Sequence, residues 1–106
     1  MKTMKFKFDG EEYNLFLTID KYMSNNNIAI SIWDTEEGPF ADLTVNICDL
    51  PKGMACIDTN NFKEGIDLIK KYDLGTFTNN FVTSGYCTYP VFALNMDNIK
   101  KYAEEV

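Results

Sequence analysis

The fold is decided by residues 4–19, MKFKFDGEEYNLFLTI, in which an Asp-Gly pair separates two runs that alternate apolar and polar side chains. Asp9 and Gly10 suit a two-residue turn, because both residues of such a turn adopt positive φ angles. Counting outward from the turn gives five cross-strand pairs: Phe8 with Glu11, Phe6 with Tyr13 and Met4 with Leu15 on one face, and Lys7 with Glu12 and Lys5 with Asn14 on the other. The stretch therefore predicts a β-hairpin with one apolar and one polar face.

Four later segments are also typical of strands. Residues 28–33 and 41–47 alternate apolar with polar or small side chains, and 54–57 form a short apolar run. The last segment is 90–94, with Pro90 at its start or on a sheet edge. Residues 79–89, directly before this last segment, are rich in Thr, Asn, Ser and Gly, which predicts a loop.

Two helices complete the predicted fold. Apolar residues recur at helical spacing over 62–74, after a cluster of capping residues at 58–61 and before the stop signal Gly75. Asn95 is expected to cap a closing helix over 96–106. The elements predict a single α+β domain over residues 1–106, with one antiparallel sheet of five or six strands and two helices packed on one face.

The composition excludes several classes of protein. The chain has 106 residues, ten Lys, 16 Asp and Glu, no His and a formal net charge of -6, and all ten basic residues are Lys. Without Arg it lacks the planar group that makes two-point contacts with phosphate or guanine, so we expect no direct binding of nucleic acid. No apolar run approaches a membrane span, and residues 1–9 alternate Lys with Phe, so we expect a soluble, cytoplasmic protein without a membrane partner.

The sequence also favours a protein that is not an enzyme. The absence of His removes Ser-His-Asp and Cys-His pairs and His-containing metal sites. Asp58 and Glu64 lack the mid-loop Gly of a calcium site, and the Gly residues stand singly rather than in a phosphate loop. The three Cys form no paired motif. We therefore expect no cofactor, no metal and no catalytic residue.

Charge distribution gives the main functional hypothesis. Between Lys21 and Lys52 there is no basic residue. The segment holds five acidic residues: Asp34, Glu36, Glu37, Asp42 and Asp49. It also holds two aromatic residues, Trp33 and Phe40, on strand positions opposite to the main apolar set. With Phe16, these aromatics are expected on the outer sheet face. Such a surface suits a basic protein partner. The alternatives are that the acidic residues only keep the domain soluble and that the aromatics form a minor core.

The segment 79–89 supplies two further hypotheses. Aromatic and hydroxyl side chains in a loop can line a pocket, so four residues are candidates for binding a small ligand or peptide: Ser84, Tyr86, Cys87 and Tyr89. An enzyme that uses Cys87 as nucleophile would need a thiol of lowered pKa, and the sequence offers no neighbouring base.

Three ordered motifs carry a resemblance to a known family. They are residues 41–46 (ADLTVN), 57–61 (IDTNN) and 84–90 (SGYCTYP). With them the chain resembles a family of small uncharacterised proteins from Gram-positive gut bacteria, often encoded on conjugative elements and prophages. The resemblance implies an anti-defence role, in which an acidic face mimics nucleic acid and blocks a basic protein such as a host defence nuclease.

Overall fold

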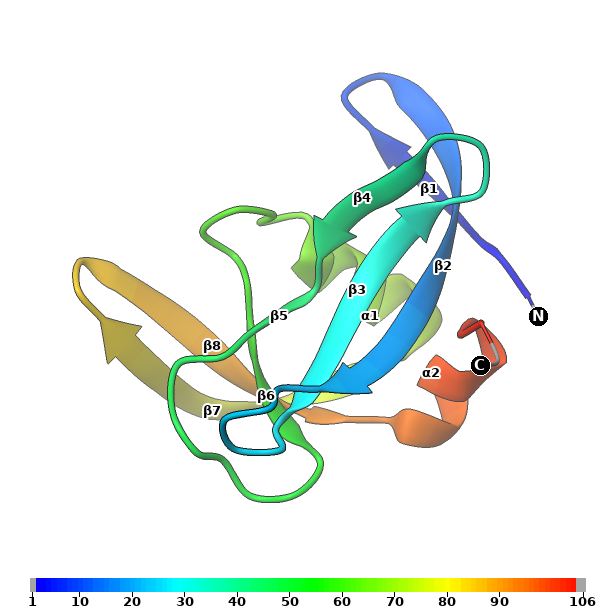
Figure 1. The fold of residues 1–106 in the computed structure, drawn as a ribbon. Coiled ribbons are helices and arrows are strands. Elements are labelled where there is room, and N and C mark those ends of the chain that lie inside the picture. Colours follow the sequence, from blue (N-terminus) through cyan, green and yellow to red (C-terminus); the bar gives the residue numbers. More distant parts are fainter. Residues whose placement is uncertain (1, 105–106) are drawn as a thin grey trace.

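The computed structural model describes residues 2–104 and contains two antiparallel sheets and two short helices (Figure 1). The first sheet has the order β1-β2-β3-β4: Met4–Phe8, Glu11–Lys21, Ile28–Asp34 and Gly38–Asp42. The second has the order β5-β6-β8-β7: Thr44–Val45, Met54–Ile57, Cys87–Leu94 and Gly75–Ser84. The helices are α1, Gly65–Tyr72, and α2, Met96–Lys101. The α+β class is confirmed, but the prediction of a single sheet is wrong.

The first hairpin has the predicted register. All five cross-strand pairs between β1 and β2 are those expected from the Asp-Gly turn. Asp9 and Gly10 have φ angles of 51° and 80°. Met4 and Leu15 on the apolar face are fully buried. The hairpin forms because the turn residues and the alternation of side chains specify the same register.

The chain crosses from one sheet to the other at Leu43. The predicted continuous strand over 41–47 is wrong, since β4 ends at Asp42 in the first sheet and β5 begins at Thr44 in the second. The buried Leu43 donates its backbone N–H to the Ile30 carbonyl at 3.0 Å, and its own carbonyl accepts from the Asp58 N–H at 3.0 Å. The apolar alternation continues across the break because Val45 and Ile47 pack against a smaller cluster of buried residues, whereas Ala41 and Leu43 pack in or against the main core.

Both sheets and both helices contribute to that core. Its cluster of buried residues contains side chains from β1, β2, β3, β6, β8, α1 and α2: Met4, Phe6, Leu15, Leu17, Ile30, Ile32, Ile57, Leu68, Ile69, Phe92 and Ile99, among others. A smaller cluster around Cys56, Tyr89 and Val91 lies on the second sheet. Within residues 2–104, no helix has the length and apolar character needed to cross a membrane.

The segment predicted as a loop is a β-hairpin. Residues 79–89 lie mostly within β7 and β8, which pair from Gly75 to Leu94 around a turn at Gly85 and Tyr86. This hairpin extends away from the rest of the molecule (Figure 1). Both of its faces are largely exposed near the turn, so the sequence there shows no apolar alternation. Pro90 is tolerated inside β8 because the pairing of β8 with β6 stops at Val91.

The helices differ from the predictions at their ends. α1 is shorter than the predicted 62–74, and the Asp58 carboxylate accepts hydrogen bonds from Asn61 in a turn instead of capping the helix. α1 ends at Tyr72 and is capped by Asp73, which has a left-handed φ of 53°, whereas Gly75 begins β7. The cap of α2 is confirmed, because the Asn95 side chain accepts from the Asn98 N–H at 3.2 Å. The predicted residues 105–106 of α2 lie outside the described residues.

Candidate functional site

The β1–β2 and β3–β4 turns lie at the same end of the first sheet (Figure 1), and acidic residues near both turns line one depression. The antiparallel pairing of β2 with β3 sets Leu15 opposite Asp34, so the start of β2 lies beside the end of β3. Between the two turns is a depression of about 160 Å³, here called the acidic depression. It is lined by Glu11, Glu12, Tyr13, Asn14, Asp34, Thr35, Glu36 and Glu37. Five of these residues are carboxylates, and none is a lysine.

Hydrogen bonds fix the walls of the acidic depression. The Thr35 N–H donates to the Asn14 carbonyl at 3.0 Å, which joins the two turns. The Asp34 carboxylate, only 8% exposed, accepts from the Glu37 N–H at 3.2 Å and closes the β3–β4 turn. The Tyr13 hydroxyl donates to the Glu11 carboxylate at 3.0 Å. These bonds fix the main chain of both hairpin ends and the carboxylates of Glu11 and Asp34, so the acidic residues are anchored at one end of the sheet.

The pKa of Tyr13 is affected by the negative charges around the acidic depression. The pKa of its hydroxyl is raised first by the hydrogen bond to Glu11, and further by desolvation and by the charges of Glu11, Glu37 and Asp34. These causes favour the neutral phenol over the phenolate. The shift identifies carboxylates from both turns as electrostatic neighbours of one group.

The predicted acidic surface is only partly assembled. Asp34, Glu36 and Glu37 lie together as expected, but Asp42 and Asp49 lie elsewhere. Asp42 is at the other end of β4, where the Ser31 hydroxyl donates to it at 3.3 Å. Asp49 is exposed in the connection between β5 and β6 of the second sheet. The prediction treated them as one surface because it considered the segment in chain order.

Sequence reasoning missed Glu11 and Glu12. Both were counted only as members of the first hairpin. The signal that could have found them is the pairing of the second and third strands. Two consecutive antiparallel hairpins place the first turn beside the turn that follows the third strand, which brings residues 11–12 close to residues 34–37.

The outer-face aromatic patch contains two of its three predicted members. Phe16 and Trp33 stack with ring centroids 6.4 Å apart, and the Trp33 indole N–H donates to the Thr18 hydroxyl at 2.9 Å. Phe40 instead packs edge-on against core-side rings, with its centroid 5.0 Å from that of Tyr13. A bulge explains the difference, because Ile32 pairs with Ala41 but Trp33 pairs with Pro39. Phe40 is the extra residue, and the predicted outward position of its side chain is wrong.

The four candidate residues of the segment 79–89 lie in different environments. Tyr86 is fully exposed at the turn, and Ser84 beside it is also exposed. Tyr89 is buried in the smaller core cluster, and Cys87 is half-buried against that cluster. Ser84 pairs with Cys87, and Tyr89 lies two residues further along β8, so these three side chains share one face of the hairpin. The pKa of the Tyr89 hydroxyl is raised first by a hydrogen bond with Cys87. Tyr86 lies apart from them at the turn.

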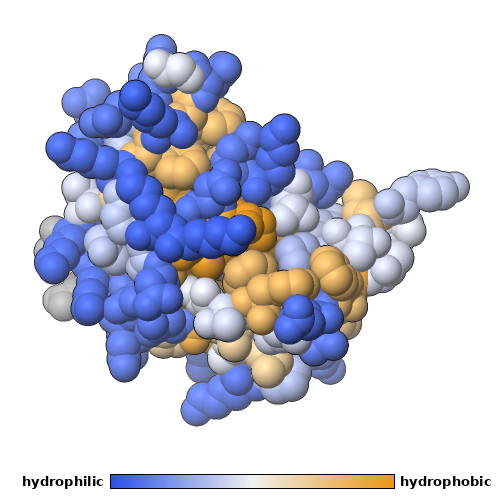
Figure 2. All heavy atoms as spheres, turned by 180° about the vertical axis from the view of Figure 1, so that it is seen from behind, coloured by the Kyte–Doolittle hydropathy of each residue, from blue (hydrophilic) through white to orange (hydrophobic). Residues whose placement is uncertain are grey.

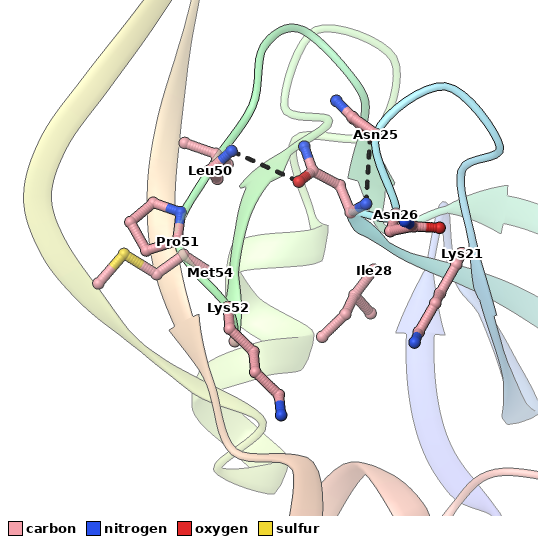
Figure 3. Close-up of a pocket in the computed structure, with 10 residues that line it drawn as sticks. Lys21, Asn25, Asn26, Ile28, Leu50, Pro51, Lys52 and Met54 are labelled. Carbon is pink, nitrogen blue, oxygen red and sulfur yellow. Dashed lines mark hydrogen bonds between the residues drawn. The ribbon is translucent and has the colours of Figure 1, made fainter.

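The second sheet and the end of β2 enclose a separate cavity of about 330 Å³ (Figure 3). Its lining comes from three segments: Lys21, Asn25, Asn26, Asn27, Ile28, Leu50, Pro51, Lys52, Gly53 and Met54. A neighbouring depression of about 540 Å³ shares Lys21, Ile28 and Lys52, and its lining also includes Lys100 from α2 and the acidic Asp20 of β2. Figure 3 shows Lys21 and Lys52 on either side of the apolar Ile28. Three lysines and one aspartate thus line this partly apolar depression. The cavity and the depression are together called the lysine-lined cavity.

Asn27 builds the wall of this cavity. Its side-chain amide donates to the Asn46 side chain at 3.1 Å and to the Cys48 carbonyl at 2.7 Å, and its oxygen accepts from the Leu50 N–H at 3.4 Å. These bonds tie the turn after β2 to the segment before β6. Since the partners are about twenty residues away in the chain, sequence reasoning had no local signal for the cavity.

Residues 2–104 contain no group of three or more Cys, Asp or Glu side chains placed to hold a metal ion.

Comparison with models of protein families assigns the chain to a family. A family model described as "Domain of unknown function (DUF4313)" matches residues 16–106. The chain belongs to the DUF4313 family. No curated protein and no solved structure matches it.

The DUF4313 match begins inside β2. It includes the β3–β4 turn, the lysine-lined cavity and the β7–β8 hairpin, whereas β1, Glu11 and Glu12 lie before it. The resemblance to an uncharacterised family is confirmed at this level. The bacterial source and the association with mobile elements stay predictions.

Proposed function

We propose that this chain is a non-enzymatic protein-binding module whose acidic depression receives a basic protein partner. The observation that carries the proposal is the convergence of five carboxylates from two turns on one depression without a lysine: Glu11, Glu12, Asp34, Glu36 and Glu37. Each turn alone would be an ordinary solvated hairpin end. Held together, they create a local negative field larger than either turn provides.

Electrostatics sets the expected behaviour of such a site. Like charges held at close range repel one another, and a cationic partner relieves that repulsion while it is steered toward the site. The interaction is screened over a Debye length of about 8 Å at physiological salt. Binding should therefore weaken as salt is added, chiefly through a slower association rate.

A more specific proposal concerns the identity of the protein partner. A protein that handles nucleic acid carries a basic groove shaped for phosphates, and fixed carboxylates can occupy the same positions. We propose a host defence nuclease as such a partner, with the acidic depression competing against DNA or RNA. The stacked Phe16 and Trp33 on the outer face of the first sheet offer an adjoining aromatic surface.

The test is capture of proteins from a lysate of a low-GC Gram-positive bacterium on the immobilised chain. Retention should fall between about 50 mM and about 200 mM salt. A variant with Glu11, Glu12, Glu36 and Glu37 changed to Gln should retain little. The matched control removes four exposed charges elsewhere: Asp49→Asn, Asp67→Asn, Asp97→Asn and Glu104→Gln.

Competition with nucleic acid tests the proposal that the partner is a nuclease. Short duplex DNA or RNA added to the captured partner should displace it from the immobilised chain if both use one groove. A partner that binds the acidic depression and nucleic acid at the same time would refute the nuclease-inhibitor proposal but not protein binding. Retention that is independent of salt and of the four Gln changes would refute both.

A second candidate function is favoured by the lysine-lined cavity. Its three lysines, Lys21, Lys52 and Lys100, outnumber its one carboxylate, Asp20. They border an apolar floor that includes Ile28 and Met96, an arrangement suited to a small anion with an apolar body. Decanoate, titrated into the ¹⁵N-labelled protein, should shift the amide resonances of residues 26–28 and 52–54. The double change Lys21→Gln and Lys52→Gln should abolish these shifts, whereas Lys63→Gln with Lys70→Gln should preserve them. Unchanged spectra at millimolar decanoate would refute this candidate.

A further inference from the structure

The sheet edges of this molecule differ in how well they are protected. A sheet edge presents unpaired N–H and C=O groups, which charged residues, prolines, bulges or short length normally shield from other strands. Of the four edge strands in the described residues, β1 carries Lys5 and Lys7, β4 carries Pro39 and Asp42, and β5 has two residues. The fourth edge, β7, has ten residues and no charge.

The whole β7–β8 arm shares this property. Residues 74–96 form the longest run of the sequence without a charged side chain. Seen from behind, the arm is a pale projection from a body with much hydrophilic surface, and hydrophobic atoms reach the surface near its base (Figure 2). Phe81 is 60% exposed on this arm, and its ring lies 5.3 Å from that of Phe77. The aromatic strip continues inward from Phe77 to the buried Phe92.

Strand geometry defines which backbone groups are free. A bulge interrupts β7 between Phe77 and Asn80, so its regular part is 80–84. Ser84 pairs with Cys87 across a two-residue turn, which makes this the first hydrogen-bonded pair of the hairpin. Because pairs alternate, the backbone N–H and C=O groups of Phe81 and Thr83 point away from β8. The arm thus offers four unpaired backbone groups at the edge of β7.

We propose that a second copy of this chain pairs with this edge, β7 against β7, in antiparallel orientation around a two-fold axis at Val82. In this register Phe81 of each copy exchanges two hydrogen bonds with Thr83 of the other, and the two Val82 side chains face each other. Shifting the axis to Phe81 or Thr83 would set the second free residue opposite the bulge or the turn. The axis at Val82 is therefore the register that pairs both free residues in each copy.

The register favours a second copy as the occupant, because a two-fold axis at Val82 pairs the free groups of Phe81 and Thr83 with each other, and the charge distribution allows it. Two chains of net charge -6 repel each other, and the uncharged arm lets their backbones meet without bringing like charges into contact. Antiparallel pairing also places the two bodies at opposite ends of the joined arms, so the acidic depressions stay far apart. The pairing places Phe81 of each copy diagonally across from the other, within reach of aromatic contact.

Sedimentation velocity over increasing protein concentration tests the proposal. The wild type should change from monomer to dimer, and added salt should not weaken the dimer, in contrast to binding at the acidic depression. Thr83→Lys sets a charge at the joined edges and should raise the dissociation constant at least about tenfold. Thr76→Lys, an exposed change on β7 outside the paired segment, should leave it unchanged. A monomeric wild type at millimolar concentration, or equal effects of both changes, would overturn the proposal.

A cross-link tests the register independently of affinity. The background carries Cys48→Ser, Cys56→Ala and Cys87→Ser, because all three native thiols are free. In it, Val82→Cys should form an intermolecular disulfide on mild oxidation, since facing residues of a non-hydrogen-bonded pair have the Cβ separation that a disulfide requires. Thr76→Cys is the control and should stay reduced. Dimerisation in which Val82→Cys cross-links no better than Thr76→Cys would overturn the two-fold axis at Val82.

Discussion

At the scale of single residues, Tyr13 connects the two acidic turns. Its hydroxyl donates to Glu11, and its ring packs edge-on against Phe40 with centroids 5.0 Å apart. One side of the residue is therefore part of the packed aromatic cluster, while the hydroxyl reports the charge of the acidic depression. The pKa of Tyr13 is therefore a quantity through which the charge of the acidic depression can be measured.

The first prediction concerns the titration of Tyr13. Glu11→Gln removes the largest cause of its raised pKa, so the phenol of Tyr13 should ionise at lower pH in the variant. The folded-state pKa lies above the unfolded value, so the stability due to this shift is complete below pH 10.0 and is lost as pH rises through the folded pKa. NMR titration of the Tyr13 ring carbon that bears the hydroxyl measures the pKa directly. Asp67→Asn should leave it unchanged, and an equal shift in both variants would contradict the assignment to Glu11.

At the scale of elements, the joint between β4 and β5 organises the molecule. Leu43 is 1% exposed and belongs to the common core, and its backbone bonds join β3 to the segment after β6. The Thr44 hydroxyl adds a bond from the buried Ile30 N–H at 3.0 Å. The two sheets are thus held together by one short stretch of main chain and the side chain that it buries.

The second prediction is that Leu43→Ala lowers the free energy of unfolding by about 2–5 kcal/mol, the range for a fully buried Leu that leaves a cavity. Val45→Ala, at a half-buried position of the adjoining β5, should cost less than half as much. Chemical denaturation followed by tryptophan fluorescence measures both, because Trp33 lies in the first sheet. Equal losses of unfolding free energy in the two variants would contradict the role of Leu43 as the buried side chain that holds the two sheets together.

The elements also show what could be predicted from the sequence. The first hairpin was predictable because its turn residues and its alternation agree, and the centre of α1 was predictable from its 3.6-residue spacing. The break at Leu43 was not, because the apolar side chains of both halves are packed, against the main core before the break and against the smaller cluster after it. The β7–β8 arm lacked a signal because both faces near its turn are exposed. Asp34, Glu36 and Glu37 were grouped correctly since they share one turn, whereas Glu11, Glu12 and the lysine-lined cavity depend on contacts distant in the chain.

At the scale of the whole molecule, three surfaces of different chemistry are separated in space. The acidic depression lies at one end of the first sheet, the lysine-lined cavity joins the end of β2 to the segment before β6, and the uncharged arm projects from the second sheet. Salt should therefore affect them differently. It should weaken protein binding at the acidic depression and leave pairing of the arms intact.

The most direct test of the central claim is the dissociation constant of a captured basic protein for two variants of equal net charge. The first carries Glu11→Gln, Glu12→Gln, Glu36→Gln and Glu37→Gln, and the second carries the four matched changes outside the acidic depression. We predict a loss of at least about tenfold for the first and of less than about threefold for the second. Equal losses would show that only the net charge of the chain matters, and would contradict a binding site at the acidic depression.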